Sequence, residues 1–143
     1  MPELLSDGDR RDARPRNGKR PSAGPGAAPV PDERDGEQRE AEITALVDRW
    51  TAHMRWRKNY DRWREDRLWQ EDHQVPRIRA IARHTEHLTG ARVLDIGSGM
   101  GGFLVAATLN GMHAVGVEPS AAYCRLTRLR GLRHGLAARV IRG

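Results

Sequence analysis

The stretch 93-VLDIGSGMGG-102 decides the fold, because an apolar run passes directly into a turn rich in glycine. Residues Arg92 to Ile96 are typical of a short buried strand. Glycine gives the next residues the freedom to turn tightly and lets a ligand approach the backbone closely. A helix is predicted from about Gly102 to Asn110, and Gly111 is expected to end it. Strand, turn and helix together predict a unit typical of nucleotide-binding parallel sheets.

The residues that follow repeat this alternation. His113 to Glu118 predict a second strand, and Ser120 is expected to cap the next helix at its N-terminus. Gly131 is expected to interrupt that helix, which should stop near Gly135. Ala138 to Ile141 predict a third strand. Strands that alternate with helices indicate an α/β fold with a parallel sheet of about three strands.

The N-terminal half divides into a tail and helical stretches. Residues 1–36 predict a disordered tail, because their composition cannot bury enough apolar area to offset the ordering entropy. Residues 37–75 form a helical extension, with a helix to about residue 72 and apolar side chains at helical spacing: Ile43, Leu46, Val47, Trp50 and Met54. A further helix is predicted from Pro76 to Leu88, which opens a domain of residues 76–143.

Basic charge collects toward the C-terminal end. The formal net charge is +6, and residues 91–143 hold two acids against seven bases. Four arginines fall on the predicted last helix, and we interpret them as its solvated face: Arg125, Arg128, Arg130 and Arg133. Four tryptophans alternate with other arginines, which suits either stacking on nucleic-acid bases or packing on a core: Trp50, Trp56, Trp63 and Trp69. Acids among them favour the core, so we expect no nucleic-acid partner.

Cysteine and histidine usage excludes several classes of protein. The single cysteine, Cys124, forms no intrachain disulfide, which favours a reducing cytoplasm. No run of about 20 apolar residues predicts a membrane span. His84 and His87 lie three residues apart on a predicted helix, but no third ligand follows at a recognisable spacing. We therefore expect no metal site and a solvent-facing histidine pair.

The glycine turn fits two kinds of nucleotide site. Gly97, Gly99 and Gly102 satisfy the G-x-G-x-x-G pattern of dinucleotide-binding turns. Glu118 ends the next strand, where a carboxylate can accept both hydroxyls of a ribose. A tight strand-to-helix turn that binds nothing would also explain the glycines.

Asp95 separates the two kinds of site. A carboxylate at the mouth of the turn would repel the pyrophosphate of NAD, which binds at helix N-termini. S-adenosylmethionine has no phosphate and carries a sulfonium and an ammonium that a carboxylate favours. The pattern D-x-G-x-G-x-G, residues 95–101, therefore fits this cofactor better than NAD. An ordinary turn-capping aspartate is the alternative that the spacing leaves open.

The segment 93-VLDIGSGMGGFLVAATLNGMHAVGVEPSAAYCRLTRLR-130 resembles the first half of a class I S-adenosylmethionine-dependent methyltransferase. Residues 95–101 match the first motif of that family, and Glu118 matches the acid that ends its second strand. The resemblance implies S-adenosylmethionine as cofactor, with Glu118 on the ribose. It implies these cofactor-binding residues: Asp95, Gly97, Ser98, Gly99, Met100, Gly101 and Glu118.

The resemblance covers residues 76–143 and implies a partial doubly wound, Rossmann-like parallel sheet. Family members have a seven-stranded sheet, so the chain is expected to be the N-terminal half of a truncated or split enzyme. The residues around the methyl acceptor, expected to be a small molecule, would lie beyond Gly143, and catalytic residues cannot be assigned. We expect no turnover by this chain alone, and an open sheet edge that favours a complementing chain or self-association. The alternatives are an NAD(P)-binding protein and a non-catalytic subunit or inert remnant.

Overall fold

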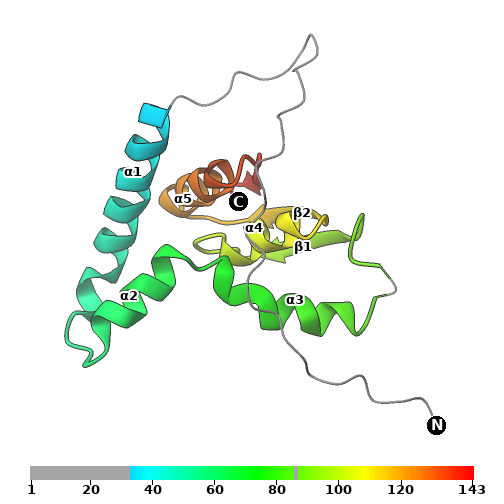
Figure 1. Ribbon diagram of the computed structural model, residues 1–143, viewed down its shortest axis with the longest axis horizontal. Coiled ribbons are helices and arrows are strands. Elements are labelled where there is room, and N and C mark those ends of the chain that lie inside the picture. Colours follow the sequence, from blue (N-terminus) through cyan, green and yellow to red (C-terminus); the bar gives the residue numbers. More distant parts are fainter. Residues whose placement is uncertain (1–32, 86) are drawn as a thin grey trace, which may run out of the picture. The chain divides into compact units, whose positions relative to one another are not determined.

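The computed structural model describes residues 33–85 and 87–143. Two units divide the chain at residue 30, and all the described residues lie in the second. Three helices come first: α1 (Glu33–Thr51), α2 (Tyr60–Leu68) and α3 (Val75–Ala82). Strands and helices then alternate (Figure 1): β1 (Arg92–Ile96), α4 (Gly102–Leu109), β2 (His113–Val117), α5 (Ala121–Arg133) and β3 (Arg139–Ile141).

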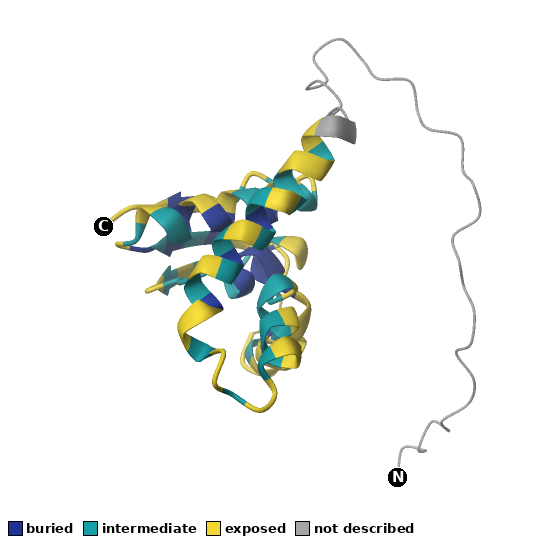
Figure 2. Cartoon of the chain, turned by 90° about the vertical axis from the view of Figure 1, so that its left-hand side faces the viewer, coloured by how far each residue is buried: buried dark blue, intermediate teal, exposed yellow. Residues whose placement is uncertain are grey.

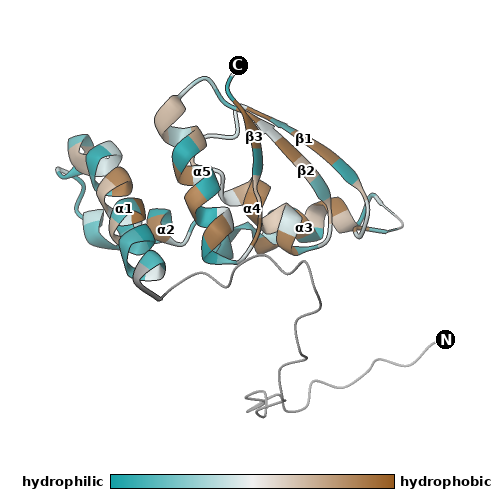
Figure 3. Ribbon diagram, turned by 90° about the horizontal axis from the view of Figure 1, so that it is seen from above, coloured by the Kyte–Doolittle hydropathy of each residue, from teal (hydrophilic) through white to brown (hydrophobic). Residues whose placement is uncertain are grey.

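The three strands form one parallel sheet in the order β1-β2-β3. The predicted α/β class is confirmed, and so are all three predicted strands, to within one residue at either end. The strand order advances in one direction, so two crossovers of the same hand place α4 and α5 on the same face of the sheet. Figure 3 shows α3, α4 and α5 on this one side.

The core lies between the sheet and its helices. Inward side chains of the strands pack with α3, α4 and α5 in one cluster: Ile78, Leu104, Ala106, Ala107, Met112, Ala114, Cys124 and Val140. A second cluster joins α1 to α5 through Ile43, Val47 and Leu126. Buried residues accordingly gather toward the interior in Figure 2. The second cluster attaches the helical extension to the sheet domain through α5.

Helix α5 begins as predicted but is not interrupted. The Ser120 hydroxyl accepts a hydrogen bond from the Tyr123 amide at 3.3 Å, which confirms the predicted N-cap. The prediction for Gly131 was wrong, because this glycine lies inside the helix and is buried. A Cβ there would come within 2.8 Å of the Ala138 Cβ. The missing side chain of Gly131 therefore lets the chain pass close to α5 as it returns toward β3. Gly135, with φ +68°, follows the end of the helix.

The predicted solvated arginine face of α5 was wrong for Arg130 and Arg133. The Arg130 side chain is fully buried, and its Nη1 lies 2.5 Å from the Glu71 Oε2. Arg133 contacts the other Glu71 oxygen at 3.1 Å and pairs with Glu40 at 2.6 Å. Both arginines also donate to the Leu68 carbonyl. These bonds fasten the segment between α2 and α3 to α5, whereas Arg125 and Arg128 are exposed as predicted.

The continuous helix predicted up to residue 72 was also wrong. The chain leaves α1 through a 3-10 turn at Ala52–Met54, and α2 begins only at Tyr60. This break lets α2 fold back on α1, where the Tyr60 hydroxyl lies 3.1 Å from the Thr51 hydroxyl. Trp50 packs on Tyr123 of α5 with ring centroids 4.5 Å apart, but Trp56 is 76% exposed. The aromatic residues therefore do not share one core-facing side.

Two helix boundaries differ from prediction. Helix α1 begins at Glu33, inside the segment expected to be a tail, and the rest of that segment, residues 1–32, lies outside the described residues. Helix α3 ends at Ala82, well before Leu88, which reaches the core from a loop. His84 and His87 are exposed, as predicted, but neither lies on a helix, contrary to prediction. No helix in the described part of the chain is long and apolar enough to cross a membrane.

Candidate functional site

The turn between β1 and α4 is built on glycines with positive φ. Gly97, Gly99 and Gly101 have φ of +70°, +55° and +79°, a conformation that costs other residues about 1–2 kcal/mol each. The amides of Gly97 and Ser98 both donate to the Val117 carbonyl, at 2.8 and 3.2 Å. These bonds fix the turn to the carboxyl end of β2. The turn thus lies at the end of a parallel sheet where α/β proteins bind ligands.

The glycines of the turn divide into an inner and an outer pair. A Cβ on Gly101 would lie 2.2 Å from the Thr127 Oγ1, and a Cβ on Gly102 would lie 2.6 Å from the Gln70 Cγ. This inner pair is required by packing within the protein. Among the described residues, a Cβ on Gly97 would meet no atom within 4 Å, and a Cβ on Gly99 only the Gly97 carbonyl oxygen at 3.9 Å. The outer pair faces open space, so a ligand can approach its backbone.

Glu118 binds the turn to the start of α5. It follows β2 directly, is only 6% exposed, and accepts a hydrogen bond from the Gly99 amide at its Oε2, at 2.8 Å. Its Oε1 accepts from the Ser120 amide, also at 2.8 Å. The two bonds fix the orientation of the carboxylate. Each oxygen keeps a second acceptor position, so Glu118 could still accept hydrogen bonds from a ligand.

Asp95 lies on β1 with its side chain on the helix-covered face of the sheet, in register with Gly116 of β2. Partial burial raises the pKa of its carboxyl group, and the charge of Arg77 on α3 acts in the opposite direction. Hydrogen bonds to the Asp95 carboxylate are absent among the residues that the structure describes. An ionised carboxylate there has lost part of its hydration, which the charge of Arg77 offsets only in part, and a cationic ligand would supply a further partner.

Two members of the predicted site use their side chains within the protein. Met100 packs against the cluster of α1 and α5. The Ser98 hydroxyl is buried beside Gly116, where a Cβ would lie 2.8 Å from it. These residues can offer a ligand only their backbone. The side chains available to a ligand from the predicted set are therefore the two carboxylates.

The structure adds residues that the sequence patterns did not single out. Tyr123 lies on the first turn of α5, and burial together with the charge of Glu118 raises its pKa. Trp50 packs on its ring, so the helical extension reaches the neighbourhood of Glu118. Arg77 lies close enough to Asp95 to oppose the rise of its pKa, and stacks on Phe103 at 4.7 Å. Tyr123 could have been found as the third residue of a capped helix, but Arg77 had no sequence signal.

The described residues form no candidate metal site. Over residues 33–85 and 87–143, no cluster of three or more His, Cys, Asp or Glu side chains could hold a metal ion. A hollow of about 400 Å³ lies elsewhere, over the beginnings of the strands rather than at the turn. No model of a known protein family matches the chain, and no curated protein matches its sequence.

Proposed function

We propose that the chain binds S-adenosylmethionine at the turn after β1 and provides the cofactor-binding part of a methyltransferase. The observation that carries the proposal is the partly buried Asp95 carboxylate, which has no hydrogen-bond partner in the described structure and lies immediately before an open glycine turn. The bound cofactor would supply an electrophilic methyl group on its sulfonium. The residues of this chain would hold and orient it.

The charge of the cofactor distinguishes it from a dinucleotide. An ionised Asp95 would attract the ammonium or sulfonium of S-adenosylmethionine, and the ligand charge would offset the desolvation of the carboxylate. The pyrophosphate of NAD carries charge of the same sign as Asp95, so an ionised Asp95 beside the turn would repel it. The N-terminus of α4 would favour an anion, but Gly101 and Gly102, where the helix begins, are buried against Thr127 and Gln70, which limits the access of a pyrophosphate to it.

Glu118 and the outer glycines fit the remainder of the cofactor. The free acceptor positions of Glu118 suit two neighbouring hydroxyls, as on a ribose. Within the part of the chain that the structure describes, the space beside Gly97 and Gly99 leaves room for a ligand against the backbone. Glu118 is held rigidly by two amides, so little ordering entropy is lost when it binds. The buried, free Cys124 is compatible with the cytoplasm, which we propose as the compartment.

Isothermal titration calorimetry of the purified chain tests the proposal. We expect heat of binding with S-adenosylmethionine and with S-adenosylhomocysteine, and weaker or no binding with NAD and NADP. Asp95→Asn should weaken binding of S-adenosylmethionine by about 1.5–3 kcal/mol, because it removes a charged partner of a cation. Asp61→Asn is the matched control, since Asp61 is exposed on α2. Tighter binding of NAD than of the sulfonium ligand would refute the assignment.

A further inference from the structure

The sheet has a second face that no helix of the described chain covers. Paired residues of parallel strands point to the same side, so the register defines this open face in three rows. The rows are Arg92 and His113, then Leu94, Val115 and Arg139, then Ile96, Val117 and Ile141. The alternate residues, such as Ala114 and Val140, are buried under the helices. Figure 3 shows the same asymmetry between the two sides of the sheet.

Most of the open face is apolar and exposed. Leu94, Ile96 and Ile141 are 62%, 78% and 58% exposed. Parallel sheets are almost always covered on both faces, because their strands are apolar on both. Contiguous exposed apolar residues with a polar rim mark interaction surfaces. The open face therefore has the properties of a surface that packs against another polypeptide.

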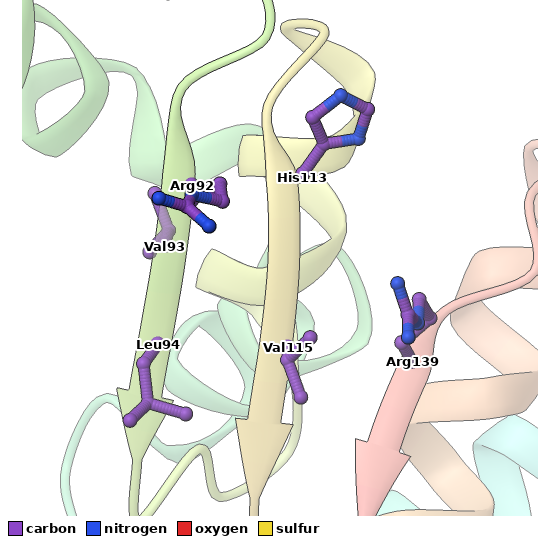
Figure 4. A pocket seen from close by; sticks show the side chains of 6 residues that line it. All are labelled: Arg92, Val93, Leu94, His113, Val115 and Arg139. Carbon is purple, nitrogen blue, oxygen red and sulfur yellow. The ribbon is translucent and has the colours of Figure 1, made fainter.

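Charge divides the open face into two ends. Arg92 and His113 form the first row and Arg139 stands in the second row beside Val115, so the basic residues lie toward one end of the face, whereas the last row is wholly apolar. These three basic side chains line the hollow of about 400 Å³. Figure 4 shows them together with Leu94 and Val115, which also line it. The eight residues of the face include no acid. Arg92 and Arg139 form no ion pair with any other described residue.

We infer that the open face binds a partner polypeptide through an amphipathic helix, with an apolar stripe over the sheet and carboxylates at the end that meets Arg92 and Arg139. A helix suits the hollow because its side chains can fill it. A second copy of the chain fits less well, since its own open face offers no carboxylate to the arginines. This inference does not depend on which cofactor the turn binds.

Reversing the charges of the basic end and of a model peptide tests the inference. The probe is a fluorescent 18-residue amphipathic helical peptide with a leucine stripe and glutamates in its first two turns; the comparison peptide has lysines at those positions. Fluorescence anisotropy with the full chain should show binding of the glutamate peptide and at least about fivefold weaker binding of the lysine peptide. The double variant Arg92→Glu, Arg139→Glu should reverse this order. Both positions are exposed, so the variant is expected to fold.

Other outcomes would overturn the inference. Leu94→Ser should weaken the binding of both peptides, and Leu132→Ser, which alters an exposed leucine on α5, should leave it unchanged. Equal affinity for the two peptides, or no binding of either, would show that the basic end does not select a partner. Self-association in light scattering that Leu94→Ser abolishes would identify a second copy as the occupant. Adsorption to vesicles containing phosphatidylserine, lost in the arginine double variant, would identify a membrane surface instead.

Discussion

The Gly99 amide donates to the Glu118 carboxylate across 2.8 Å, although nineteen residues separate them in sequence. The bond joins the turn after β1 to the residue after β2. The other oxygen of the same carboxylate holds the start of α5 through the Ser120 amide. One side chain thus fixes three elements at the carboxyl edge of the sheet, and it can do so while keeping acceptor positions for a ligand.

Replacing Glu118 tests this structural role directly. Glu118→Ala should lower the free energy of unfolding by about 1.5–3 kcal/mol, because two backbone amides lose a charged acceptor in a buried place. Urea denaturation of the chain without ligand measures the effect. Glu37→Ala, an exposed carboxylate on α1, is the control. An unchanged urea midpoint for Glu118→Ala would mean that water replaces the carboxylate without loss of stability.

Replacing Asp95 should raise the stability of the chain while it weakens ligand binding. Burial raises the pKa of its carboxyl group, so the protonated form contributes stability at acidic pH that is lost as the pH rises through the raised pKa. Asp95→Asn should therefore stabilise the chain at neutral pH, and the gain should disappear below about pH 4. Thermal unfolding across this pH range measures it. A destabilised variant at neutral pH would indicate that the carboxylate has a partner within the protein.

The inner and outer glycines should respond differently to alanine. Gly101→Ala should destabilise the chain by at least about 2 kcal/mol, because both the positive φ and the contact with Thr127 oppose a Cβ. Gly97→Ala should cost only about 1–2 kcal/mol, from φ alone. Circular dichroism melts compare the two. Equal losses would show that the packing distinction between the two pairs is wrong.

The buried ion pair of Glu71 and Arg130 should make the stability of the chain depend on pH in the acidic range. Burial acts to raise the pKa of Glu71, but the charge of Arg130 and the bonds from its other partners outweigh this and lower it. The resulting stability is complete above the unfolded pKa, about 4.3, and is lost as the pH falls through the lower folded value.

The substitution that tests this pH dependence is Glu71→Gln. It should cost about 3–5 kcal/mol at neutral pH, because Arg130 stays buried without its counter-charge. It should also remove part of the acid dependence. Urea titrations at several pH values measure both effects. A variant with the same slope of stability against pH as the original chain would show that Glu71 does not cause the dependence.

Local patterns predicted the sheet because each strand and turn is specified by adjacent residues. The apolar run before Gly97 and the capping position of Ser120 required no information from distant parts of the chain. The burial of Arg130 could not be predicted locally, because it depends on Glu71, which lies on a different segment. The end of α1 at Thr51 was missed for a similar reason: the helical spacing continues beyond it, and only the return of α2 against α1 makes the break favourable.

For the candidate site, spacing predicted a set of residues but not the orientation of their side chains. Asp95 and Glu118 were both predicted as ligand carboxylates, and the structure distinguishes a carboxylate without a partner in the described chain from one already bound by two amides. Ser98 and Met100 belong to the turn in sequence, but their side chains face the protein. Such differences arise from packing between elements, which a motif does not encode.

The most direct test of cofactor binding is a titration of ¹⁵N-labelled chain with S-adenosylmethionine, followed by amide NMR. The account predicts shifts of the Gly97, Gly99 and Glu118 amides that saturate together, and binding weakened by about 1.5 kcal/mol or more, over tenfold, with Asp95→Asn. NAD at the same concentrations should leave these signals unmoved. Unmoved turn signals with S-adenosylmethionine, or shifts of the same amides with NAD alone, would contradict the account.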